Sequence, residues 1–297
     1  MFARVLFPTD FSAYANAVFD CLPGLKAAGL KQVILLSVIR TGDVPMADTP
    51  VNEESFARVK WSAEENLHIA QHALEGQGVS ARTRVEYGDP AREIVRIAQD
   101  ECIDLIVMGA QGQSLFQDLL LGNTAFDVLR LSPIPVLIEK CDVVREMGHT
   151  QCQRVCQTTC TRVLHPTDFS ACANAAFNLV KRLKPAGMEE AILLHVQDER
   201  AMQQRPADQI AEFDRQDFER LEQMKRTLAL SNIPAKTMVR HGIPFRETLK
   251  VADEEKATVI VVGLYGRNAF EEMVGGGTFE KIVRQSRRPV LVVRETK

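Results

Sequence analysis

The sequence predicts two α/β domains in tandem, each with a five-stranded parallel sheet and helices on both faces. Three observations support this. The chain has 297 residues, about twice the length of a common domain. Its second half repeats its first, and in each half short β-branched runs alternate with longer amphipathic stretches. Such connections are right-handed crossovers, and strand order 3-2-1-4-5 is the common Rossmann-like or flavodoxin-like solution, with close alternatives left open.

The internal repeat sets the domain boundaries. Residues 4–19 read RVLFPTDFSAYANAVF and residues 162–177 read RVLHPTDFSACANAAF, so they differ at only three of sixteen positions. The match continues in order, at an offset of 158 and then of 154. We therefore expect one domain over 1–140, a linker over 141–160 and a second domain over 161–297.

Each half contains five apolar runs suited to strands and several segments suited to helices. In the first half we expect strands at 3–7, 32–38, 81–86, 104–108 and 135–139, and helices at 12–28, 53–75, 90–100 and 123–131. In the second half we expect strands at 162–165, 190–196, 236–240, 258–262 and 289–293. Trp61 and the phenylalanines of the long helices are interpreted as core residues.

Composition excludes several classes of protein. The net charge of −3 and the pI near 6.1 argue against a nucleic-acid or anionic-membrane surface. No apolar run approaches the roughly 20 residues of a membrane helix, and the first residues resemble a strand more than a signal peptide. Seven cysteines, an odd number, argue against a secreted disulfide framework. We expect a cytoplasmic protein.

The predicted sheet places its ligand site between strands 1 and 4, at their carboxyl ends. Strand 1 is followed by Pro8, Thr9 and Asp10, and its repeat by Pro166, Thr167 and Asp168. An aspartate there can accept hydrogen bonds from a sugar hydroxyl or a base amine, or it can cap the following helix. The two interpretations are compatible, because the serine two residues later can be the cap.

Strand 4 is followed in both halves by the spacing G-x2-G-x9-G-x-T. The first copy comprises Gly109, Gly112, Gly122, Asn123 and Thr124; the second comprises Gly263, Gly266, Gly276, Gly277 and Thr278. Glycines let backbone approach an anion, and the free N–H groups of a helix start can hold phosphate. A threonine hydroxyl adds a donor to phosphate or a ligand to a phosphate-bound metal. No P-loop is present, so we expect phosphate to be held by backbone and hydroxyls.

These motifs resemble the universal stress protein family over about nine tenths of the chain, and the glycine spacing resembles its ATP-binding branch. The resemblance implies that ATP or AMP, with Mg²⁺ or Mn²⁺ on its phosphates, binds two sets of residues. The first set is Pro8, Thr9, Asp10, Val38, Met108, Gly109, Gly112, Gly122, Asn123 and Thr124. The second set is Pro166, Thr167, Asp168, Val196, Val262, Gly263, Gly266, Gly276, Gly277 and Thr278.

The second copy departs from the family pattern. The family usually has serine after the third glycine, where this chain has Asn123 and Gly277, and Gly277 offers only its backbone. Tyr265 and Arg267 add bulk and charge to the second loop. The first site is therefore the stronger prediction.

The resemblance also implies an assembly. Family domains dimerise through the last strand, so the two halves of this chain are expected to form that pair within one molecule, through 136–138 and 290–293. Pairing would cover two apolar edges that otherwise favour aggregation. A further homodimer stays open.

Other residues allow alternative interpretations. Cys152, Cys156 and Cys160 in the linker could bind zinc or sense oxidants, but their spacing matches no familiar zinc motif, and a packed linker is the competing interpretation. His165 and His195 lie on predicted strands and are interpreted as core histidines, with ligand contact by His165 beside the predicted cleft as the alternative.

The sequence thus favours an adenine-nucleotide-binding module, coupled by resemblance to a stress response. A slow ATPase or phosphotransferase is the alternative, although the loops offer no ordered acid–base pair. A scaffold whose second site has degenerated is a third interpretation.

Overall fold

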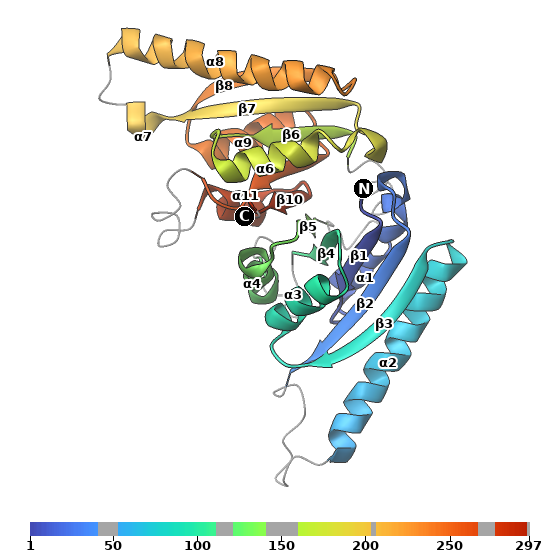
Figure 1. Cartoon of the computed structure of the whole chain (residues 1–297). Helices are drawn as coiled ribbons and strands as arrows, with labels where there is room; N and C mark the ends of the chain where they lie inside the picture. Colours follow the sequence, from blue (N-terminus) through green and yellow to red (C-terminus); the bar gives the residue numbers. More distant parts are fainter. Residues whose placement is uncertain (41–52, 111–120, 141–159, 203–205, 267–276, 296–297) are drawn as a thin grey trace. The chain divides into compact units, whose positions relative to one another are not determined.

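A computed structural model of the protein describes residues 1–40, 53–110, 121–140, 160–202, 206–266 and 277–295. The chain forms two compact units, Met1–Cys156 and Gln157–Lys297. In each unit, helices cover both faces of a parallel sheet (Figure 1). The predicted α/β fold class is therefore confirmed.

The sheet of the first unit has the strand order β3-β2-β1-β4-β5, and its pairs are parallel. Its strands are β1 (Arg4–Pro8), β2 (Gln32–Ile39), β3 (Ser80–Tyr87), β4 (Leu105–Gly109) and β5 (Val136–Glu139). The central strands are apolar at nearly every position because both faces of a parallel sheet are buried. The neighbours β1 and β4 are joined in register by Leu6 and Ile106, and their carboxyl ends form the switch point of the sheet.

The helices of the first unit are α1 (Ala13–Phe19), the 3₁₀ helix η1 (Leu22–Ala28), α2 (Glu53–Gly76), α3 (Pro90–Asp100) and α4 (Asn123–Leu131). Right-handed crossovers place α1 and α2 on one face of the sheet and α3 and α4 on the other. The helices α3 and α4 pack against each other. The start of α4 therefore lies beside the carboxyl end of β4.

The single helix expected over 12–28 is wrong. α1 ends at Phe19, and the chain continues from Leu22 as a 3₁₀ helix with Pro23 in its first turn. Proline has no N–H, and in an α-helix its ring clashes with the carbonyl four residues earlier, which is that of Phe19. The 3₁₀ segment closes at Gly29, whose φ of +94° lies in the left-handed region.

The expected core position of Trp61 is also wrong, because its side chain is 63% exposed. α2 instead buries Ala63, Leu67 and Leu74, which share one face of the helix. Trp61 precedes Ala63 by two residues and so lies roughly 200° around the helix from that face. Of the long-helix phenylalanines, Phe218 of the second unit is likewise exposed.

The second unit repeats the architecture with the strand order β8-β7-β6-β9-β10. Its strands are β6 (Arg162–Pro166), β7 (Glu190–Asp198), β8 (Ala235–Gly242), β9 (Val259–Gly263) and β10 (Val290–Val293). Its helical elements are α6 (Ala171–Val180), η3 (Lys184–Ala186), α7 (Glu199–Met202), α8 (Ala207–Ala229), α9 (Pro244–Glu254) and α11 (Thr278–Gln285). The strand order 3-2-1-4-5 is thus confirmed in both units, and observed strand ends lie within two residues of the predicted ones.

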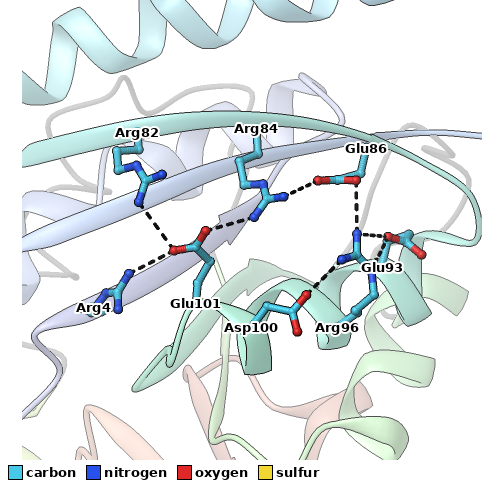
Figure 2. Close-up of polar contacts among 8 residues, drawn as sticks. All are labelled: Arg4, Arg82, Arg84, Glu86, Glu93, Arg96, Asp100 and Glu101. Carbon is cyan, nitrogen blue, oxygen red and sulfur yellow. Dashed lines mark hydrogen bonds and ion pairs between the residues drawn. The ribbon is translucent and has the colours of Figure 1, made fainter.

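An ion-pair network joins α3 to the sheet in the first unit (Figure 2). Glu101, at the end of α3, accepts hydrogen bonds from Arg4 at 3.1 Å and Arg84 at 2.9 Å, and Arg82 lies 3.5 Å from the same carboxylate. The network comprises Arg4, Arg82, Arg84, Glu86, Glu93, Arg96, Asp100 and Glu101. It fixes the helix whose other end borders the switch point.

In the part of the chain that the structure describes, every helix is too short or too polar to cross a membrane.

Candidate functional site

The first unit has a pocket of about 360 Å³ at the switch point of its sheet. This volume lies within the roughly 300–1,000 Å³ of small-molecule sites. The pocket is lined by the ends of β1, β2 and β4 and the starts of α3 and α4: Pro8, Thr9, Asp10, Ala15, Leu36, Val38, Arg40, Pro90, Ile94, Met108, Gly109, Ala110, Gly122, Asn123, Thr124 and Ala125. Segments that are far apart in the sequence therefore form one cavity.

The turn after β1 presents Asp10 at the pocket. Thr9 Oγ1 accepts a hydrogen bond from the Phe11 amide, and Asp10 Oδ1 accepts one from the Ser12 amide, both at 3.0 Å. Phe11 adopts a left-handed φ of +58° to close this turn. Ser12 is the N-cap of α1, since its Oγ accepts from the Ala15 amide at 3.2 Å. The cap is therefore the serine, and Asp10 lines the pocket from a fixed turn.

The start of α4 forms another wall of the pocket. Gly122 is the N-cap, it provides no side-chain cap, and its own amide donates to the Ala110 carbonyl at 2.8 Å. The first N–H groups of a helix have no intrahelical acceptor and carry the positive end of the helix dipole. This wall can therefore hold an anion through backbone groups.

The sequence interpretation missed the pocket residue Arg40, which follows β2. Its Nη2 donates a hydrogen bond to Thr124 Oγ1 at 2.8 Å, in the first turn of α4. A signal was present, since strand alternation places residue 40 on the same side as Val38. Arg40 brings a permanent positive charge to the wall that the start of α4 forms.

The remaining walls are largely apolar. Their apolar lining residues come from β2, β4, α3 and α4: Leu36, Val38, Met108, Ile94 and Ala125. The pocket thus combines an apolar slot, one carboxylate and an anion-binding wall. A planar base with a sugar and an anionic group matches this arrangement chemically.

The second unit has a pocket of about 120 Å³ in the equivalent place. It is lined by Pro166, Thr167, Asp168, Ser170, Ala173, Leu194, Val196, Pro244, Thr248, Val262, Gly263, Tyr265, Gly266, Thr278, Phe279 and Ile282. Its turn repeats the first one: Asp168 Oδ1 accepts from the Ser170 amide at 2.9 Å, and Ser170 caps α6. At the offset of 154, Phe279 replaces Ala125, and its ring lies 6.0 Å from that of Tyr265. Two aromatic side chains thus line the smaller second pocket.

The predicted first-unit residues that the structure describes all line the first pocket, and Gly112 lies outside the described residues. In the second unit Gly276 is likewise outside them, and Gly277 is the N-cap of α11 without being a lining residue. The other predicted second-unit residues line the second pocket.

Gly263 has a packing role as well. A Cβ at this position would lie 2.6 Å from the Cys172 carbonyl carbon, closer than any side chain tolerates. Glycine therefore permits the close approach of β9 to α6, apart from any role in the pocket.

The two histidines on central strands of the second unit are buried. His165 Nδ1 lies 2.9 Å from the Val261 carbonyl oxygen, and burial lowers the pKa of its imidazole to about 4. His195 Nδ1 lies 2.7 Å from the carbonyl oxygen of Thr167, and its Nε2 lies 3.2 Å from Asp217 of α8. His195 thus links α8 to the turn that lines the second pocket.

The linker cysteines form no described metal site. Cys152 and Cys156 lie outside the described residues, and Cys160 lies two residues before the start of β6. Within the described ranges, no group of three His, Cys, Asp or Glu side chains is placed to hold a metal ion.

Comparison with known proteins identifies the family. The model of the universal stress protein family matches residues 1–140 and 159–294. A universal stress protein of Methanocaldococcus jannaschii is 32% identical over 152 residues, covering 45% of this chain and 94% of the relative. One from Synechocystis is 30% identical over 141 residues, covering 46% of this chain and 85% of the relative.

A solved structure resembles the whole chain. The crystal structure of a universal stress protein from Archaeoglobus fulgidus superposes with a TM-score of 0.78 at 27% identity, and the alignment covers 100% of both chains. The two family matches account for both units. The chain therefore belongs to the universal stress protein family.

Proposed function

We propose that the first unit binds an adenine nucleotide, ATP or AMP, and that the chain acts as a nucleotide-dependent binding module in a stress response. The observation that carries the proposal is the pocket at the switch point, in which Asp10 and the start of α4 form two walls of one cavity. The glycine spacing typical of the family's ATP-binding branch supports it.

Each part of the pocket has a role in this proposal. The adenine ring lies between Val38 and Met108, where burial of apolar surface stabilises it. Asp10 accepts hydrogen bonds from the ribose hydroxyls or the base amine. The phosphates bind the amides at the start of α4, where both the unpaired N–H groups and the helix dipole favour negative charge.

A divalent cation would reach this site with the phosphates. The described lining residues contribute one carboxylate, Asp10, and the hydroxyl of Thr124, among other oxygen atoms. Mg²⁺ usually keeps several waters and binds through one or two protein oxygens plus phosphate. The donor set fits a phosphate-bound Mg²⁺ and does not fit a resident metal centre.

The pairing of the two units through their last strands stays a prediction.

Calorimetric titration with ATP and Mg²⁺ tests the proposal, with Gly122→Val as the blocking variant. Gly122 has a φ of −62°, which valine can adopt, so the variant is expected to fold. Its side chain would cover the backbone at the start of α4 and abolish ATP binding. Gly76→Val is the matched control, because nothing lies within 4 Å of a Cβ there. Undiminished ATP affinity in folded Gly122→Val would overturn the assignment.

A further inference from the structure

Arg40 distinguishes the two pockets by charge. Among the described lining residues of the first pocket it is the only cation, and Asp10 is the only anion. Its hydrogen bond to Thr124 Oγ1 holds the guanidinium at the first turn of α4. A guanidinium stays protonated at any physiological pH and matches the geometry of phosphate oxygens. The cation thus lies on the wall that the proposed function assigns to phosphate.

The second unit carries the opposite charge at the corresponding position. At the offset of 158, Arg40 aligns with Asp198, the last residue of β7. Asp198 Oδ1 accepts a hydrogen bond from the Arg200 amide at 3.0 Å, within the turn that follows β7. The described lining of the second pocket contains Asp168 and no lysine or arginine. Among the described lining residues, the second pocket therefore lacks the cation that the first pocket offers to an anionic ligand.

The difference in pocket volume also favours nucleotide binding in the first unit over the second. The second pocket has about 120 Å³ against about 360 Å³ in the first, and Phe279 stands where the first has Ala125. A volume below roughly 300 Å³ is small for a drug-sized ligand. Charge and volume together disfavour a base, a sugar and a phosphate chain in the second unit.

We propose that Arg40 is the phosphate-recognising cation of the first site, and that its replacement by Asp198 confines phosphate binding to the first unit. This inference rests on the proposed function and specifies the ligand class, a phosphorylated nucleoside in preference to the free nucleoside. Arg40 contributes to the binding of the phosphates and leaves recognition of the base and sugar to the other walls.

The test compares ATP and adenosine binding by calorimetry in the wild type, Arg40→Gln and Arg40→Lys. Loss of a charge-assisted hydrogen bond predicts a roughly tenfold to hundredfold weaker ATP affinity in Arg40→Gln, with adenosine affinity unchanged. Arg40→Lys keeps the charge and should retain part of the ATP affinity. Lys60→Gln, on the exposed surface of α2, is the control for the change in net charge. Circular dichroism verifies that each variant is folded.

The outcomes separate the two proposals. Equal weakening of ATP and adenosine in Arg40→Gln, or no weakening of either, would overturn the role of Arg40 while leaving nucleotide binding intact. No binding of ATP or AMP by the wild type would instead refute the proposed function itself. Two ATP per chain in the wild type, with one retained in Gly122→Val, would show a phosphate site in addition to the first pocket and overturn the confinement to the first unit.

Discussion

Phe279 stands in the second unit where Ala125 stands in the first, at equivalent positions of the first turn of α11 and α4. Both side chains line the pocket of their own unit. The exchange of a methyl group for a benzyl group accompanies a threefold smaller cavity in the second unit. Two copies of one fold thus offer different space to a ligand.

A phenylalanine at position 125 of the first unit, as at Phe279 of the second, should block the first pocket. In Ala125→Phe the new ring would occupy the slot proposed for the nucleotide, so we expect ATP affinity to fall at least a hundredfold. Calorimetry measures the affinity, and thermal unfolding shows whether the variant is folded. Ala125→Gly, which adds no volume, is the matched control and should bind. A folded Ala125→Phe protein with unchanged affinity would show that the nucleotide binds elsewhere.

Substitutions of Asp10 and of Ser12 should have different effects, the first on ligand affinity and the second on the free energy of unfolding. Asp10→Ala should weaken adenosine binding about tenfold, the value of one hydrogen bond to a charged group. It should lower the free energy of unfolding by less than about 1 kcal/mol, because Ser12 supplies the helix cap. Ser12→Ala should do the reverse, with a loss of about 1 kcal/mol of stability and unchanged affinity. Chemical unfolding and calorimetry on both variants provide the comparison. Intact affinity with a large loss of stability in Asp10→Ala would assign Asp10 a structural role only.

The ion-pair network of Figure 2 predicts a stability effect centred on Glu101. Its carboxylate is only 16% exposed and lies near three arginines, so Glu101→Gln should lower the free energy of unfolding by about 1–2 kcal/mol. Urea unfolding at low and high salt measures this, and the difference should shrink at high salt. Glu64→Gln removes an exposed helix pair with Lys60 and should change stability by less than about 0.5 kcal/mol. Equal effects of the two substitutions would show that the network contributes no more than a surface pair.

Burial of Glu139 predicts that stability falls as pH rises. Desolvation raises the pKa of this carboxyl to about 7, despite a hydrogen bond from the Lys140 amide. Above its unfolded pKa of 4.5 the native state binds more protons than the unfolded state, so stability decreases from pH 4.5 to pH 7. The limiting loss is about 3 kcal/mol. Glu139→Gln should flatten the profile in urea unfolding at several pH values. An unchanged slope in that variant would contradict the prediction.

Burial of His165 predicts that stability falls as pH falls. Burial lowers its pKa to about 4 from the unfolded value of 6.5, so the native state binds fewer protons and stability decreases as pH falls from 6.5 to 4. His165→Phe supplies the residue that the first unit has at Phe7 and should remove about 3 kcal/mol of this acid sensitivity. Phe7→Leu, a hydrophobic substitution in the other unit, should leave the slope unchanged. A profile that keeps its acid slope in His165→Phe would contradict the assignment.

The sequence predicted the strands well because buried parallel strands leave a local signal. Runs such as Leu105–Gly109 are apolar at consecutive positions, whichever face they present. The repeated glycines and the Pro-Thr-Asp turns also indicated where the pocket would form. The end of α1 at Phe19 was not predicted, although Pro23 indicates that an α-helix cannot continue through this segment.

Other features depend on contacts that no local pattern reveals. Which face of α2 is buried depends on how the helix packs on the sheet, so the prediction that Trp61 is a core residue is wrong. Arg40 follows a strand predicted to end at residue 38, and its approach to Thr124 is a contact between residues 84 positions apart. The second pocket, of about 120 Å³, is lined by Phe279 and Tyr265, whose rings contact each other although both residues are distant in the sequence from the turn after β6.

Native mass spectrometry of the full chain titrated with ATP and Mg²⁺ tests the central claim most directly. We predict one ATP per chain in the wild type and none in Gly122→Val, which places the nucleotide in the first unit. Two nucleotides per chain would contradict the asymmetry between the pockets, and no bound nucleotide at saturating ATP would contradict the account as a whole.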